Sequence, residues 1–151
     1  MNKLKIVVML FCAALISSCV TATTYQRAKS PTGTGYYDTI LQTDMYEITF
    51  NGNSNTSVTT AQDFAFLRAA ETCLENGYKT FEVVNFNNNS KTETDAFTFY
   101  GRHYADTTVY TSTYPKIVHI IRCSKEGNLT FIAEEISNNL RKKYHLEEQY
   151  K

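Results

Sequence analysis

The sequence predicts an α+β fold: a single small domain with a three- to four-stranded sheet and two helices on one face, in the order β-α-β-(β)-β-α. Three observations predict it. Residues 45–51 alternate apolar and polar side chains, residues 61–76 place apolar side chains at helical spacing, and residues 116–123 form an apolar, β-branched run. The chain also contains 11 tyrosines and is rich in threonine, which suits half-buried strands.

The first predicted strand, residues 45–51, exposes one face and buries the other. Its apolar face carries Tyr46, Ile48 and Phe50. A second strand is predicted over residues 80–86, shortly after the helix. A strand, a helix and a strand with short links suggest a right-handed β-α-β unit.

The helix between these strands has recognisable ends. Thr59 or Thr60 is expected to cap its start, and Gly77 is suited to the position just after its end. Arg68 and Glu71 are three residues apart and are expected to form a solvated ion pair. The apolar stripe is predicted to consist of Phe66, Leu67, Ala70, Cys73 and Leu74.

The second half of the chain is harder to interpret. Residues 87–114 begin as a polar loop and become aromatic and β-prone, which allows one more strand or a hairpin before Pro115. A last helix is predicted over residues 130–144, with acidic side chains early and basic ones late, as the helix dipole favours. Its apolar stripe is predicted to be Phe131, Ile132, Ile136, Leu140 and Tyr144.

The N-terminus has the layout of a secretory signal peptide, predicted to cover residues 1–18. Lys3 and Lys5 precede an apolar run over residues 6–16. That run is too short for a transmembrane helix, which needs about 20 apolar residues.

Residues 16–19 resemble the bacterial lipobox, in which a hydrophobic residue and two small residues precede a cysteine. The resemblance implies that Cys19 receives a diacylglyceryl group on its thiolate sulfur and becomes the mature N-terminus. Val20 is not aspartate, which in Gram-negative sorting implies transport to the cell outer membrane. The alternative is a soluble exported protein cut after Ala22, because residues 20–22 fit the general signal peptidase.

The predicted mature chain divides into three parts. Residues 19–34 are polar and threonine-rich and are expected to form a flexible tether. Residues 35–146 are expected to form the α+β domain, and residues 147–151 a frayed tail. Loss of Lys3 and Lys5 leaves 13 basic and 15 acidic side chains, a net charge of −2. This balance gives no basic footprint for nucleic acid.

Cys73 and Cys123 remain after export and lipidation. An exported protein lies in a compartment that permits disulfides. The two residues can pair, or they can remain two buried thiols that act as small apolar side chains. The sequence leaves both open.

No catalytic or metal-binding motif is found, so a cofactor, a metal and enzymatic activity are not expected. His119 shares a strand face with Cys123 and could bind a metal with it. Two ligands at this spacing make no complete site, so a strand histidine without a metal is the expected interpretation.

Residues 97–104 combine aromatic side chains with arginine and histidine, the types that anchor interfaces. They are the candidate contact surface: Phe99, Tyr100, Arg102, His103 and Tyr104. The alternative is a strand that buries Phe97 and Phe99 and exposes the rest.

Four short segments occur in the order found in a family of short uncharacterised bacterial lipoproteins: residues 35–38, residues 46–54, residues 67–71 and residues 77–81. They are a Gly-Tyr start, a Gly-Asn-Ser turn, an Arg-Ala-Ala-Glu helix and a Gly-Tyr-x-x-Phe segment. The chain resembles this family over about residues 33–85. The resemblance supports anchoring and the fold but implies no reaction and no site residue.

The function expected from the sequence is that of a lipid-anchored outer-membrane protein, non-enzymatic, which binds a periplasmic or envelope partner. The membrane is then a partner through the covalent lipid. Two alternatives remain: a small envelope enzyme or ligand-binding protein, and the soluble exported protein described above.

Overall fold

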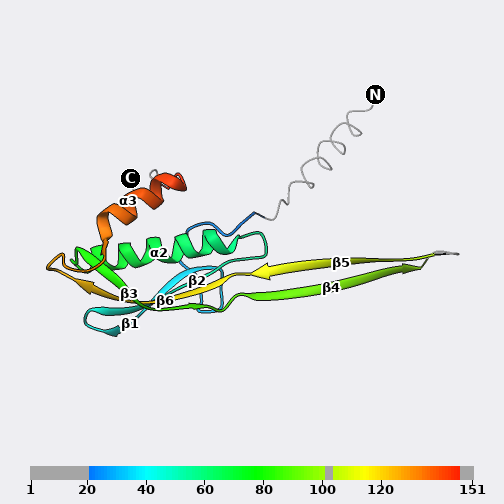
Figure 1. Ribbon diagram of the computed structural model, residues 1–151, viewed down its shortest axis with the longest axis horizontal. Coiled ribbons are helices and arrows are strands. Elements are labelled where there is room, and N and C mark those ends of the chain that lie inside the picture. The colour runs from blue at the N-terminus through cyan, green and yellow to red at the C-terminus, as the bar shows by residue number, and fades with distance from the viewer. Residues whose placement is uncertain (1–20, 101–103, 147–151) are drawn as a thin grey trace, which may run out of the picture.

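The computed structural model describes residues 21–100 and 104–146 (Figure 1). It forms an α+β domain from which a long β-hairpin projects. In chain order its elements are β1 (Gly35–Gln42), β2 (Met45–Asn51), α2 (Val58–Glu75), β3 (Thr80–Asn88), β4 (Lys91–Tyr100), β5 (Ala105–Tyr114), β6 (Lys116–Ser124), β7 (Phe131–Ile132) and α3 (Ala133–Lys143).

Five strands form one antiparallel sheet in the order β1-β2-β6-β3-β7. Both helices lie on the same side of it, with α2 against the strands and α3 against α2 (Figure 1). The predicted α+β class is confirmed. The predicted strand number is too low, because the described residues form seven strands in two sheets.

The β-α-β unit is present in a split form. β2 and β3 both run antiparallel to β6, so they are parallel to each other. β6 lies between them, and each pairs with it over its length. The helix therefore links two strands that are not neighbours, a connection that local sequence cannot distinguish from a direct crossover.

The start of α2 differs from its prediction. Ser57 is the N-cap, and its hydroxyl accepts a hydrogen bond from the Thr60 amide at 2.9 Å, so neither Thr59 nor Thr60 caps the helix. Leu74, predicted on the apolar stripe, is 38% exposed.

The end of α2 follows its prediction. Gly77 has φ +75° and donates to the Leu74 carbonyl, while Tyr78 donates to the Cys73 carbonyl. This pair of bonds is a Schellman motif, which glycine favours at positive φ.

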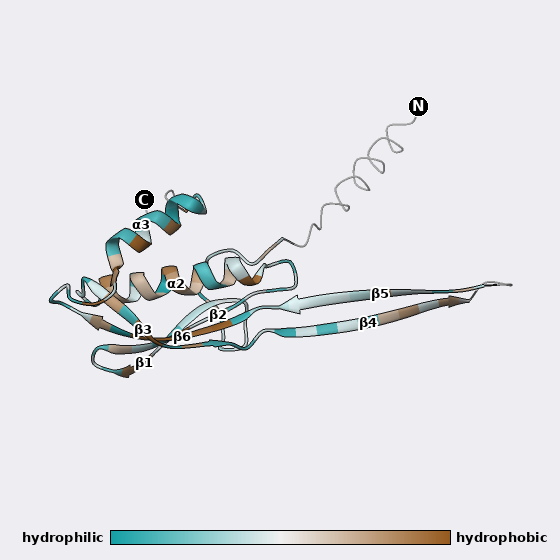
Figure 2. Cartoon of the chain, in the orientation of Figure 1, coloured by the Kyte–Doolittle hydropathy of each residue, from teal (hydrophilic) through white to brown (hydrophobic). Residues whose placement is uncertain are grey.

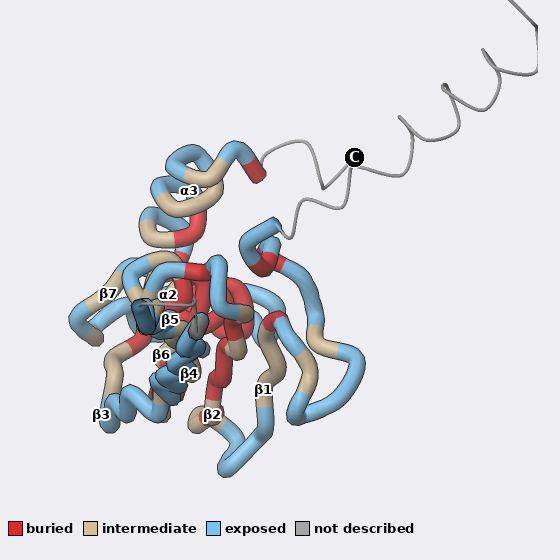
Figure 3. The backbone as a smooth tube through the Cα atoms, turned by 90° about the vertical axis from the view of Figure 1, so that its right-hand side faces the viewer, coloured by how far each residue is buried: buried red, intermediate tan, exposed pale blue. Residues whose placement is uncertain are grey.

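Two groups of buried side chains fill the space between the sheet and α2. Figure 3 colours the backbone of buried residues red. One group includes Ile48, Phe81 and Ile121, and the other includes Phe50, Leu67 and Ile117. Burial of these side chains is the main stabilising contribution, at about 1.5–3 kcal/mol for each large residue.

Residues 21–34 do not form the flexible tether predicted for residues 19–34. The Thr23 amide donates to the Thr56 hydroxyl at 2.8 Å, and the Tyr25 ring lies in the core, 8% exposed. Arg27 forms a bridge with Tyr36 beside β1. The folded unit therefore begins at about Thr23. The predicted signal peptide, Cys19 and the tail at residues 147–151 lie outside the described residues.

The last helix begins at Ala133, later than predicted, because the two residues before it form β7 against β3. Ile132 is 55% exposed and does not belong to the apolar stripe. Glu134 lies in the first turn of the helix and Lys143 in the last, the charge order that the dipole favours. Beyond α3, Leu146 is buried in the core.

Candidate functional site: a projecting β-hairpin arm

The cysteines predicted to pair or to remain free form a disulfide. Cys73 on α2 and Cys123 on β6 are bonded, with Cα atoms 5.8 Å apart, and both are buried. The bond fastens the helix to the central strand of the sheet. Cys123 is therefore not available to bind a metal together with His119. The described residues contain no group of three side chains that could hold a metal ion.

His119 is buried in an apolar environment rather than at a site. Its ring lies 5.2 Å from the Phe86 ring and 6.2 Å from the Phe66 ring, centroid to centroid, and it is 7% exposed. Neither ring nitrogen has a hydrogen-bond partner among the described residues. Burial disfavours the charged imidazolium and lowers the pKa of His119 to about 4.

Stability is expected to fall as the pH falls from about 6.5 to about 4. In this pH window the histidine of the unfolded chain is protonated, whereas buried His119 in the folded protein is neutral. Protonation therefore favours the unfolded state. The loss attributable to His119 is up to about 3 kcal/mol, since one pKa unit corresponds to about 1.36 kcal/mol. Urea unfolding of the native chain and of His119→Leu at pH 7 and pH 4 measures it. An equal pH dependence in both proteins would contradict this account, because the two proteins differ only at residue 119.

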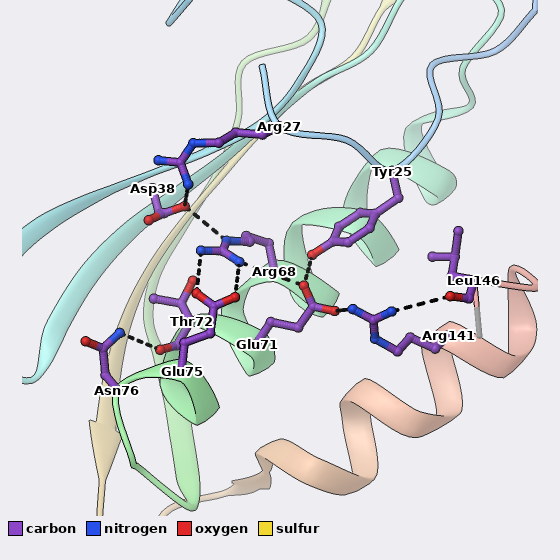
Figure 4. Close-up of polar contacts among 10 residues, drawn as sticks. All are labelled: Tyr25, Arg27, Asp38, Arg68, Glu71, Thr72, Glu75, Asn76, Arg141 and Leu146. Carbon is purple, nitrogen blue, oxygen red and sulfur yellow. Dashed lines mark hydrogen bonds and ion pairs between the residues drawn. The ribbon is translucent and has the colours of Figure 1, made fainter. Parts of the chain in front are cut away.

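The most extensive polar cluster surrounds Arg68 on α2 (Figure 4). The guanidinium, only 5% exposed, donates two hydrogen bonds to Glu75, at 2.7 and 2.9 Å, and one to Asp38 on β1 at 3.0 Å. Burial disfavours its charge, but the bonds to Glu75 and Asp38 outweigh burial and raise the pKa of Arg68. Glu71 lies 3.9 Å away, so the pair predicted to be solvated is buried.

Glu71 joins this cluster to two other parts of the chain. It accepts hydrogen bonds from the Tyr25 hydroxyl and from the Arg141 guanidinium of α3 (Figure 4). Burial, and then the neighbouring Glu71 charge, raise the pKa of Tyr25. The polar groups of the cluster form the contacts that connect the N-terminal segment, β1, α2 and α3. The cluster therefore stabilises the fold.

The candidate functional site is instead the hairpin of β4 and β5, which we call the arm. The arm continues the β3–β6 ribbon in the same register: Asn88 pairs with Ile117, and Lys91 pairs with Tyr114. The ten paired residues of each strand give it a length of about 33 Å. The arm leaves the domain at one end of the sheet (Figure 1).

The junction of the arm with the sheet is tightly packed. Pro115 interrupts the ladder and is buried, and its carbonyl accepts a hydrogen bond from the Gly52 amide at 2.8 Å. A Cβ atom at Gly52 would lie 2.6 Å from the Pro115 ring, so this position has no room for a side chain. The arm is therefore held firmly at its base.

The two faces of the arm differ in chemistry. One face carries cross-strand threonine pairs, such as Thr98 with Thr107 at 3.0 Å between hydroxyls. The other carries large side chains in solvent, and Figure 2 shows the apolar end of β4 toward the tip. Its exposed fractions are 58% for Phe97, 64% for Phe99, 58% for Tyr110 and 39% for Tyr114.

The predicted contact residues lie at the outer end of the arm. Phe99 and Tyr104 are exposed, with Tyr104 at 71%, and Tyr100 ends β4. Arg102 and His103 lie outside the described residues. The alternative that a strand face buries Phe97 and Phe99 is wrong, because both side chains are exposed.

Sequence reasoning missed Tyr110, which lies beside Phe97 with ring centroids 6.1 Å apart. The signal that could have found it is the similar length of the two β-prone stretches on either side of residues 101–104. Two stretches of equal length around a short connection are typical of a hairpin.

A cavity of about 310 Å³ lies at the base of the arm. Two lysines and a tyrosine are among the residues that line it: Lys91, Lys116 and Tyr114. Its size suits a small ligand.

Comparison with protein-family models, with curated proteins and with solved structures finds no match. Within residues 21–100 and 104–146, no helix has the length and apolar character needed to cross a membrane.

Proposed function

We propose that this protein is a lipid-anchored protein of the bacterial outer membrane, attached through Cys19, which acts by binding an envelope partner and not by catalysis. The apolar run that ends in Ser17, Ser18 and Cys19 supports the anchor, and Val20 supports the outer membrane. The buried Cys73–Cys123 disulfide is consistent with export.

The observation that carries the binding role is the arm. Contiguous exposed aromatic side chains are uncommon on soluble domains and are typical of interaction surfaces. Phe97, Phe99 and Tyr110 lie together on one face of the arm. The arm is about 33 Å long, and these exposed side chains contribute nothing to the core.

The position of the anchor supports the same role. Thr23 is fixed by Thr56, and the side-chain amide of Asn53 in the same loop donates to the Thr21 carbonyl at 2.7 Å. The neighbouring Gly52 contacts Pro115 at the arm base. The four residues from Cys19 to Thr23 reach at most about 14 Å. An anchored protein therefore presents the base of its arm close to the membrane.

Replacing Cys19 by serine is expected to abolish palmitate incorporation and to release the protein from the membrane fraction, because the serine hydroxyl does not accept the diacylglyceryl group. Radiolabelled palmitate and fractionation of producing cells measure both. A Cys19→Ser protein that remains in the membrane fraction would contradict the anchor.

Removal of the arm is expected to abolish partner binding and to leave the domain and anchor intact. Lys91 and Tyr114 are paired, so an Asn-Gly turn in place of residues 92–113 closes the ribbon at that pair. Chemical crosslinking of cells that produce either protein, followed by purification, compares their partners. The same crosslinked partners in both would contradict the role of the arm.

A second candidate function is the binding of a small ligand, favoured by the cavity at the arm base. The arm-shortened variant keeps Lys91, Tyr114 and Lys116, which line that cavity. It would therefore retain a ligand while losing an arm partner, so one variant separates the two functions.

A further inference from the structure

The arm has two unpaired edges. Its ribbon consists of β4 and β5 alone, and the structure places no third strand beside either of them in the described chain. A two-stranded ribbon is at best marginally stable in water, whereas three or more strands with an apolar face are stable. An additional strand would therefore stabilise the arm.

The two edges differ in their charge. β4 carries Lys91, Glu93 and Asp95 in its inner half. β5 carries Asp106 near its tip, and its other residues are alanine, threonine, valine, tyrosine and serine. Charged side chains are a common protection of edge strands against pairing. The β5 edge lacks this protection over most of its length.

We infer that the arm binds a second copy of this chain, and that the two β5 strands pair antiparallel about a two-fold axis near Tyr110. A register centred on Tyr110 places Asp106 opposite Tyr114 of the other copy. A register centred on Val109 places it opposite Ser112. In both, the two Asp106 carboxylates are about 20 Å or more apart.

The same operation centred in the charged inner half of β4 is unfavourable. A register centred on Asp95 places this carboxylate against its own copy, and one centred on Thr94 places it against Glu93. Like charges directly opposite each other destabilise a strand pair. With three charged side chains on β4 against one on β5, β4 is the better-protected edge, and β5 is the edge left open for self-association.

The paired arms form a four-stranded sheet, β4-β5-β5-β4, with a closed isologous interface. Tyr110, Phe97 and Tyr114 of each copy lie on one face of it, because residues opposite each other in the ladder share a face. Aromatic side chains from the two copies then meet across the axis, the type of pair that stabilises sheets.

This inference names the partner of the arm and rests on the proposed function. It is tested with the full chain in cells that export it, using Tyr110→Cys and a short bis-maleimide crosslinker that spans neighbouring registers. Cys73 and Cys123 are in a disulfide and do not react. Tyr110→Cys is expected to give a covalent dimer on a denaturing gel. Glu93→Cys, exposed on the same face but on β4, is expected to give none.

A matched pair of lysine substitutions tests the edge. Thr94 and Thr111 are exposed cross-strand partners with hydroxyls 3.5 Å apart, so they differ mainly in the strand that carries them. Adding Thr111→Lys to Tyr110→Cys is expected to reduce the dimer about tenfold, because a charge is placed in the new strand pair. Adding Thr94→Lys is expected to leave it unchanged.

Three results would overturn the inference: no more dimer from Tyr110→Cys than from Glu93→Cys, equal effects of the two lysines, or a Tyr110→Cys adduct with a different protein. The last result leaves the proposed partner-binding role in place. Loss of every adduct, together with unchanged partners in the arm-shortened variant, removes both.

Discussion

Replacing Arg68 by methionine is expected to lower the free energy of unfolding by about 3–5 kcal/mol, the usual effect of removing one member of a buried ion pair. Methionine fills much of the same space but removes the hydrogen bonds that the guanidinium donates to Glu75 and Asp38. It also removes one of the two guanidinium groups beside the buried Glu71 carboxylate. Urea unfolding of the mature chain at pH 7 measures the change.

Arg122→Met is the matched control. Arg122 also contacts a carboxylate, Glu82 at 3.4 Å, but its side chain is 47% exposed. A surface pair of this kind contributes about 0–1 kcal/mol. If the two methionine variants lost the same stability, the cluster around Arg68 would not stabilise the fold in the way described above.

Loss of the Cys73–Cys123 bond is expected to lower the free energy of unfolding by about 4 kcal/mol in the chain-entropy model, because the two residues are 50 apart in sequence. The double replacement by alanine also removes two buried sulfur atoms, so its effect is at least as large. Urea unfolding of the variant and of the native chain measures the loss.

A reductant provides the control for the disulfide. It should destabilise the native chain and leave the double alanine variant unchanged, because the variant has no bond to break. If the wild-type protein, unfolded without reductant, showed two free thiols, that result would contradict the disulfide.

The elements that the sequence predicts well are those whose pattern is local. β2 occupies the predicted residues 45–51 because alternation in Tyr46, Ile48 and Phe50 requires no knowledge of partners. α2 ends just before Gly77, because glycine at this single position readily adopts the positive φ that the C-terminal turn requires.

The elements that the sequence predicts poorly depend on distant partners. β4 and β5 are exposed on both faces, so burial imposes no alternation on them, and only their mutual register defines them. The polar segment before Gly35 is packed because of Tyr25, whose partner Glu71 is 46 residues away.

The same limit applies to the polar groups. Arg68 and Glu71 have the spacing of a surface pair on a helix, but distant parts of the chain cover them. Asp38 of β1 contacts Arg68, while Tyr25 and Arg141 contact Glu71. The exposed aromatic residues at the arm tip could be named from composition alone, as Phe99 and Tyr104 were. Tyr110 could not, because its place beside Phe97 is set by the register.

The central claim is that the mature protein begins at a lipidated Cys19. The most direct test is the intact mass of the protein purified from the envelope fraction of exporting cells. The predicted result is a chain that starts at Cys19 and carries a diacylglyceryl group on sulfur and an acyl group on its amine. An unmodified chain that starts at Thr23 would contradict it.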